Sequence, residues 1–133
     1  MSKKKHLSLN SSTDEVYKLE GFVDQLQQWA DFNDDIYGNI MLTLSEAVSN
    51  AIIHGNKENP EKEIKVSAWL NGGSIKISVK DEGEGFDPDA LPDPLKAENL
   101  LKEGGRGVFL MGQYADNVEY SEQGNKLTLT FKI

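Results

Sequence analysis

In the first part of the chain, hydrophobic positions recur with the period of an α-helix. Apolar residues recur at this spacing from Thr13 to about Phe32, directly after the N-cap residues of the stretch SSTDE. A second segment with the same period begins near Asp34 and ends near His54-Gly55-Asn56. The pattern therefore predicts two consecutive amphipathic helices.

Strict alternation of apolar and polar residues predicts strands before and after these helices. The run from His6 to Asn10 alternates, as do IKVSAWL and SIKISVKD on either side of the turn residues NGG. A short helical segment, RGVFLMGQYA, precedes a second hairpin that is turned at Gly124-Asn125. This order of elements predicts an α+β fold, a two-layer α/β sandwich whose helices lie on one face of a mostly antiparallel sheet.

Length and composition exclude several classes of protein. The chain of 133 residues is expected to form a single domain, residues 1–133, and it contains no cysteine for disulfides or thiolate chemistry. It shows neither a signal-peptide pattern nor an apolar run of about 18–20 residues, so we expect a soluble cytoplasmic protein without a membrane partner. The net charge of −8 argues against a nucleic-acid binder, although it leaves room for a small phosphate ligand.

The second predicted helix has a polar stripe with little charge. No Lys or Arg occurs from Ile36 to Asn56, whereas a solvated helix face usually has several charges. One interpretation is a weakly charged exposed face, and the other is a stripe that faces a polar ligand. We favour the ligand. The stripe consists of Asn39, Thr43, Glu46 and Asn50.

Two glycine-rich segments add candidate chemistry. DEGEGFD, from Asp81 to Asp87, follows a strand, and it is either a tight acidic turn or a site where the backbone approaches a flat ligand. GGRG, from Gly104 to Gly107, precedes a helix and resembles a phosphate cradle, although any flexible loop could look similar. The spacings fit neither a calcium loop, nor a Walker loop, nor a dinucleotide fingerprint.

The order of the three motifs is more informative than any one of them. E-x-x-x-N on a helix, then D-x-G-x-G-F-D, then G-R-G-x-x-L-M resembles the nucleotide-binding boxes shared by gyrase, heat-shock chaperones, histidine kinases and mismatch-repair ATPases. SEAVSNAIIHGN, DEGEGFDP and GGRGVFLM are most similar to the anti-sigma-factor serine/threonine kinase family, and the similarity runs from about Ser11 to Phe131. The resemblance implies a Bergerat ATP-binding fold with a lid at about residues 87–104.

The resemblance also implies roles for the helix and for the first glycine-rich segment. Glu46 would be the general base, and Asn50 would offer its oxygen to Mg²⁺. Asp81 would accept a hydrogen bond from the amino group of adenine. Gly83 and Gly85 would let the backbone close around the base.

The second glycine-rich segment would bind the phosphates of ATP. Gly105 and Gly107 would contact the β and γ phosphates through the backbone, and Arg106 would stabilise charge on the transferred group as a catalytic residue. ATP, ADP and Mg²⁺ are therefore the expected ligands.

The expected function is that of an ATP-dependent serine/threonine kinase and anti-sigma factor, acting in partner switching. It would bind a sigma factor, phosphorylate a serine of an anti-anti-sigma protein and form a homodimer. The alternative is a nucleotide-dependent regulatory binding module with little or no kinase activity. A histidine-kinase catalytic domain is disfavoured because no helical hairpin with a phosphoacceptor His precedes the domain. A gyrase-like ATPase is disfavoured because the second domain that captures the γ-phosphate is missing.

Overall fold

The computed structural model describes residues 4–57, 59–83, 112–121 and 125–133. Strand β1 (Lys4–Asn10) and a 3₁₀ turn (Thr13–Glu15) precede the helices α1 (Lys18–Ala30) and α2 (Asp34–Asn50). Helix α2 continues into a π-helical turn (Ala51–Gly55). The strands β2 (Glu63–Asn71), β3 (Ser74–Lys80), β4 (Asn117–Ser121) and β5 (Lys126–Lys132) complete the order.

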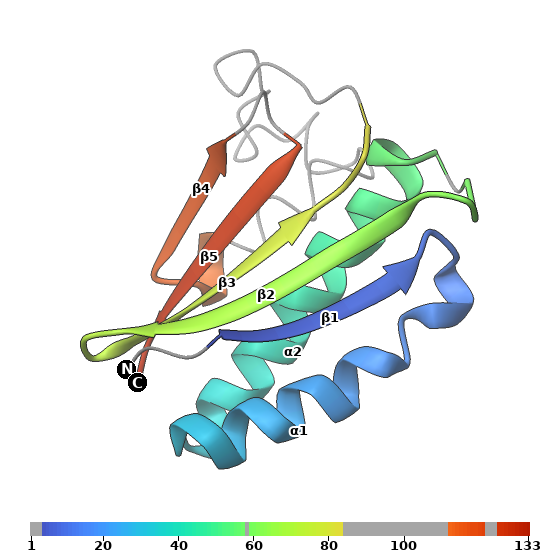
Figure 1. Ribbon diagram of the computed structural model, residues 1–133. Coiled ribbons are helices and arrows are strands. Elements are labelled where there is room, and N and C mark those ends of the chain that lie inside the picture. The colour runs from blue at the N-terminus through green and yellow to red at the C-terminus, as the bar shows by residue number, and fades with distance from the viewer. Residues whose placement is uncertain (1–3, 58, 84–111, 122–124) are drawn as a thin grey trace.

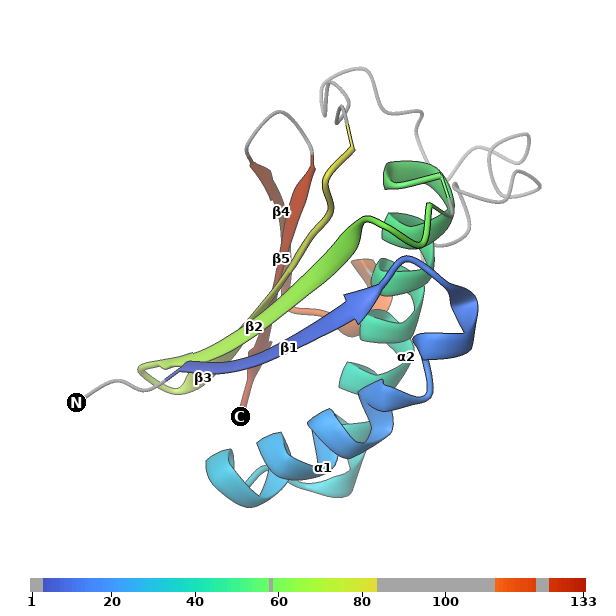
Figure 2. The same cartoon turned by 45° about the vertical axis from the view of Figure 1, so that its right-hand side comes forward.

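The described strands form one sheet in the order β1-β2-β3-β5-β4, and every neighbouring pair is antiparallel. Both helices lie on the same face of this sheet, as the two views in Figure 1 and Figure 2 show. The predicted α+β sandwich and the two predicted hairpins, β2–β3 and β4–β5, are confirmed.

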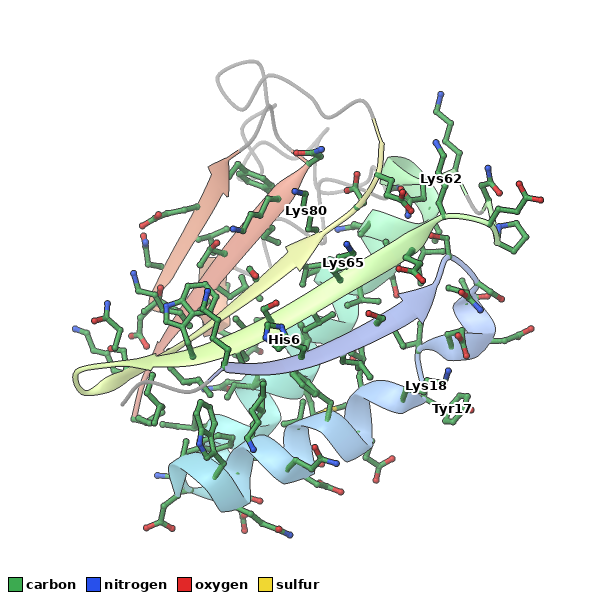
Figure 3. All side chains as sticks on the ribbon, viewed as in Figure 1. His6, Tyr17, Lys18, Lys62, Lys65 and Lys80 are labelled. Atoms are coloured by element: carbon green, nitrogen blue, oxygen red, sulfur yellow. The ribbon has the colours of Figure 1, made fainter. Side chains whose placement is uncertain are left out.

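The core lies between the helices and the inner face of the sheet. Burial alternates along β2, β5 and the first half of β3, because successive side chains of a strand point to opposite faces. Figure 3 shows His6, Lys65 and Lys80 on the outer face of the sheet. Among the most buried core residues are Leu9, Val23, Leu26, Ile40, Leu44, Val48, Ile64, Ile77 and Leu129. Burying each such side chain stabilises the fold by about 1.5–3 kcal/mol.

The start of α2 follows the predicted capping pattern. The Asn33 side chain accepts a hydrogen bond from the Ile36 N–H at 3.0 Å, and Asp34 and Asp35 lie in the first turn. Both features favour a helix start, because they satisfy a free N–H group and complement the positive end of the helix dipole. In the described part of the chain, no helix is long and apolar enough to cross a membrane.

The first predicted helix is interrupted near its start. Instead of one helix from Thr13 to Phe32, the chain forms a separate 3₁₀ turn, and α1 begins only at Lys18. Ser12 explains the early turn, because its hydroxyl accepts a hydrogen bond from the Asp14 N–H at 3.3 Å. Glu15 bridges to Lys18 at 2.8 Å and links the turn to the helix.

Part of the predicted chemistry lies outside the described residues. This applies to the lid at about 87–104, to Gly85 and to the phosphate-binding residues Gly105, Arg106 and Gly107. Of the predicted short helix near the end of that segment, residues 112–114 are described and are helical.

Gly38 is exposed on the surface of α2. A glycine inside a helix suggests close packing, but no described atom lies within 4 Å of a Cβ built at Gly38, and the same is true of Gly21 in α1. Within the described part of the chain, Gly38 therefore has no close contact outside the backbone of its own helix. Both residues lower helix stability without an evident packing reason.

Replacing Gly38 with alanine should stabilise the protein. We expect Gly38→Ala to raise the free energy of unfolding by about 0.5–1 kcal/mol, because alanine loses less backbone entropy in a helix. Urea denaturation measures the change. Gly72 is the control, since its φ of +61° makes Gly72→Ala destabilising despite open space around it. A loss of stability in Gly38→Ala would show that this surface is covered.

Candidate functional site

The polar stripe of α2 divides into a buried part and an accessible part. Thr43 is fully buried, and its hydroxyl donates to the backbone oxygens of Asn39 and Ile40 at 2.8 and 3.2 Å. Glu46 and Asn50 are half-buried, and no side-chain hydrogen bond to another described residue occupies them. Thr43 is therefore satisfied inside the fold, whereas Glu46 and Asn50 remain able to meet a ligand.

Glu46 and Asn50 are held in the last turns of α2. Their spacing of four residues places them one above the other on the same helix face. The inner face of these turns is fixed in the core by Ala47 and Val48, which are buried. The helix thus holds the Glu46 carboxylate and the Asn50 amide in fixed positions relative to each other. Such an arrangement suits a site that must position two groups of a ligand.

The end of α2 widens into the π-helical turn. The Asn56 N–H donates to the Ala51 oxygen, five residues earlier, at 2.8 Å. Turns of this kind are rare and often occur at functional sites. Here the widened turn brings Gly55 against the segment that follows β3.

The contact between Gly55 and that segment leaves no room for a side chain. A Cβ at Gly55 would overlap the Asp81 carboxyl group, and a Cβ at Gly83 would overlap the backbone oxygen of Gly55. Two glycines are therefore required for the turn at residues 81–83 to pack on the helix end. Gly83 was predicted as a site residue, whereas the role of Gly55 was not.

The carboxyl group of Asp81 is fixed by its own turn. The Gly83 N–H donates to Oδ1 of Asp81 at 2.8 Å, and the Asp81 N–H donates to the Asn125 oxygen at 3.0 Å. Within the described residues, Oδ2 of Asp81 has no hydrogen-bond donor. This oxygen can accept from an N–H group of a ligand, as the predicted adenine contact requires.

Burial raises the pKa of the Asp81 carboxyl above its ordinary value, against the lowering effects of the Gly83 N–H and the Lys62 charge. Figure 3 shows Lys62 at the end of the sheet where β2 begins, close to the end of the α2 ribbon. The surroundings of Asp81 therefore disfavour its ionised form. Carboxyl groups with a pKa shifted in this way are common at functional sites.

Asn56 is the site residue that sequence reasoning missed. It is 1% exposed, and its side chain bonds to Ser11, Glu63 and Glu82, which are 45, 7 and 26 residues away in the chain. The sequence pattern placed Asn56 only at the end of a helix. No local signal could have identified these partners, because they are brought together by the tertiary fold.

The described residues fit an adenine nucleotide. A free carboxylate oxygen lies beside two positions without Cβ atoms, as an amino group and a flat ring would need. Asn50 offers an amide oxygen, a hard ligand suited to Mg²⁺. In the described part of the chain, no group of three or more His, Cys, Asp or Glu residues could hold a metal ion.

The raised pKa of Asp81 makes a prediction about stability. A raised carboxyl pKa means that stability is greatest below the unfolded pKa of about 3.9 and falls as pH rises through the folded value. Without nucleotide, Asp81→Asn should therefore have a higher melting temperature than wild type at pH 7, and the difference should disappear below about pH 3.9. Calorimetry across pH tests this. A lower melting temperature at pH 7 would show that the carboxylate stabilises the turn.

Comparison with known proteins agrees with the fold and identifies the family. Residues 9–131 match the family described as "Histidine kinase-like ATPase domain". An anti-sigma F factor of Heyndrickxia coagulans is 35% identical over 115 residues, which cover 84% of this chain and 76% of the relative. An anti-sigma F factor of Geobacillus stearothermophilus is 32% identical over 115 residues, covering 85% of this chain and 76% of the relative.

A solved structure supports the fold independently. The structure of the RsbU and RsbW domains of Rv1364c from Mycobacterium tuberculosis superimposes with a TM-score of 0.65 at 17% identity. The match covers 97% of this chain and 31% of that chain, so this chain spans about a third of it. The resemblance inferred from the three motifs is thereby confirmed. The chain belongs to the histidine kinase-like ATPase domain family, in the branch that includes the anti-sigma F factors.

Proposed function

We propose that this protein is an ATP-dependent serine/threonine kinase and anti-sigma factor that acts by partner switching. It binds a sigma factor, and it phosphorylates a serine of an anti-anti-sigma protein. The name of its relatives, anti-sigma F factor, supports the first partner, and the family supports ATP as the phosphoryl donor. Homodimerisation and a cytoplasmic location are part of the same proposal.

One observation supports this function most directly. A single helix presents Glu46 and Asn50 on one accessible face, and the end of the same helix packs against the Asp81 turn. A candidate base-binding group thus packs against the end of the helical segment that presents the candidate general base. Catalysis by positioning needs this kind of attachment, since small displacements of reacting groups cost large factors in rate.

In the proposed phosphoryl transfer, Glu46 acts in the step in which the serine hydroxyl attacks ATP. The attacking serine Oγ forms a bond to the γ-phosphorus of ATP, the bond from that phosphorus to the bridging oxygen breaks, and ADP leaves. Glu46 accepts the hydroxyl proton as general base, which its carboxylate can do from within about 3 Å. Its partial exposure keeps the carboxylate within reach of a serine of another protein.

The remaining residues bind the nucleotide. Asp81 accepts from the adenine amino group, and the backbone at Gly83 and Gly85 approaches the base. Asn50 ligates Mg²⁺, which neutralises phosphate charge in a protein of net charge −8.

The phosphate end of the site is assigned to the second glycine-rich segment. Gly105 and Gly107 offer backbone N–H groups to the β and γ phosphates. Arg106 stabilises charge on the group in transfer.

Substitutions in α2 should separate catalysis from binding. Glu46→Gln keeps the size of the side chain but not the proton acceptor, so phosphate transfer should fall by roughly 10²–10⁴-fold while ATP affinity changes little. Asn50→Ala should lose both Mg²⁺-dependent ATP binding and transfer. Asn39→Ala, in the same stripe, is the control and should change neither.

The assay uses the natural partners. A pull-down from the native cell with ATP and Mg²⁺ recovers them, and mass spectrometry identifies phosphoserine. Radiolabelled transfer is then measured beside calorimetric titration of the same variants. Transfer by Glu46→Gln at the wild-type rate would refute the base assignment. A wild-type protein that binds partners and transfers nothing would favour the nucleotide-dependent binding module.

Base selectivity gives a separate test. Wild type should bind ATP much more tightly than GTP, because guanine presents a carbonyl oxygen where adenine presents its amino group to Asp81. Asp81→Asn should weaken ATP binding by about 1–3 kcal/mol, the usual effect of mispairing a buried polar group. Calorimetry with both nucleotides measures this, and equal affinity of wild type for ATP and GTP would contradict the adenine assignment.

A further inference from the structure

The side chain of Asn56 connects elements that are distant in the sequence. Its Nδ2 group donates to the Ser11 hydroxyl at 2.6 Å and to the Glu63 oxygen at 3.0 Å. Its Oδ1 atom accepts from the Glu82 N–H at 2.7 Å. A buried carboxamide with all these partners joins the residues after β1, the start of β2 and the turn after β3 to the end of α2.

Glu82 is attached at both its backbone and its side chain. Its N–H donates to Asn56, and its carboxylate accepts from the Glu63 N–H at 2.5 Å. Glu82 is the residue between Asp81 and Gly83, which form the nucleotide-facing turn. Fixing Glu82 therefore fixes the middle of that turn.

Asp81 is consequently held between two anchors. On one side its N–H donates to the Asn125 oxygen just before β5, and on the other the next peptide is held by Asn56. The first anchor belongs to the sheet, whereas the second belongs to the helix layer. Of these two hydrogen bonds, only the second joins the turn to the end of the helical segment that presents Glu46 and Asn50, where Gly55 also packs against it.

We propose that Asn56 is a positioning residue for nucleotide recognition. Its carboxamide sets the Asp81 turn against the end of α2, so that adenine selection by Asp81 is kept in register with Glu46 and Asn50. This inference rests on the proposed function. It adds the residue that joins the base-binding turn to the catalytic helix.

A purely structural role makes a different prediction. If Asn56 only stabilised the fold, any loss in its network would lower stability and nucleotide binding together. If it positions the turn, only the loss of its bond to Glu82 changes selectivity. Ser11→Ala is the matched control, because it removes the Ser11 bond to Nδ2 and leaves the Oδ1 bond intact.

The experiment compares Asn56→Ala, Asn56→Asp and Ser11→Ala in the full chain, by thermal melting and by calorimetry with ATP and GTP in Mg²⁺. Asn56→Ala should reduce the preference for ATP over GTP by roughly tenfold. Asn56→Asp keeps an acceptor for the Glu82 N–H and should retain most of the preference while losing stability. Ser11→Ala should also lose stability but keep the wild-type preference.

A second measurement needs no nucleotide. The pKa of the Asp81 carboxyl, measured by NMR titration, should move toward its ordinary value in Asn56→Ala, because a displaced carboxyl group is better hydrated. It should remain raised in Ser11→Ala. Neither Asn56→Ala nor Ser11→Ala adds or removes a charged group, and Lys62 and the Glu82 carboxylate are present in both, so the comparison of the two variants reports on the position of Asp81.

The results of these experiments distinguish a failure of this inference from a failure of the proposed function. A wild type without ATP preference contradicts the adenine assignment within the proposed function, and the Asp81 titration then decides the role of Asn56 alone. Wild-type selectivity and pKa in Asn56→Ala would overturn the positioning role, as would parallel losses in Ser11→Ala. If Asn56→Ala does not fold, Asn56→Ser replaces it, because its hydroxyl is too short to reach the Glu82 N–H.

Discussion

The structure of the site depends on close packing between the end of α2 and the turn after β3. Gly55 and Gly83 meet where neither could have a Cβ atom, and the Asp81 carboxyl group fills the space beside them. A side chain at either position would push the turn away from the helix. The Asp81 carboxyl group, the proposed base-binding group, would then no longer be fixed relative to Glu46 and Asn50. The widened π-helical turn matters for the same reason, since it sets where Gly55 lies.

This packing disfavours the ionised form of the Asp81 carboxyl group, and the proposed function gives a reason for keeping that group. It buries part of the Asp81 carboxyl, and burial raises its pKa, so the ionised form is less stable in the fold than in water. An amide of the same size would avoid this desolvation of a charge. The proposed function gives a reason for keeping the carboxylate, since its Oδ2 atom lies beside two glycines and could accept from an amino group on a flat ring.

Sequence periodicity predicted the helices and the sheet, because these depend on which residues are buried. The order of the three motifs, through the family that they resemble, indicated Glu46, Asn50, Asp81 and Gly83 as candidate site residues. It did not predict Asn56, whose partners are brought together only by the tertiary fold. Nor did it separate Thr43 from the rest of the polar stripe, since a threonine that donates to its own helix looks the same in sequence as one that faces a ligand.

The glycines of this chain show why residue type alone could not place the site. Gly38 and Gly55 both occur near or within the same long helical segment, yet a Cβ would meet open space at the first and the Asp81 carboxyl group at the second. The difference arises from β3, whose end brings the Asp81 turn onto the end of α2 but not onto its start. The contact is made by Gly55 in the π-helical turn that continues α2 beyond Asn50. The place where β3 ends therefore decides which end of the helical segment lies beside Asp81 and can serve the proposed nucleotide site.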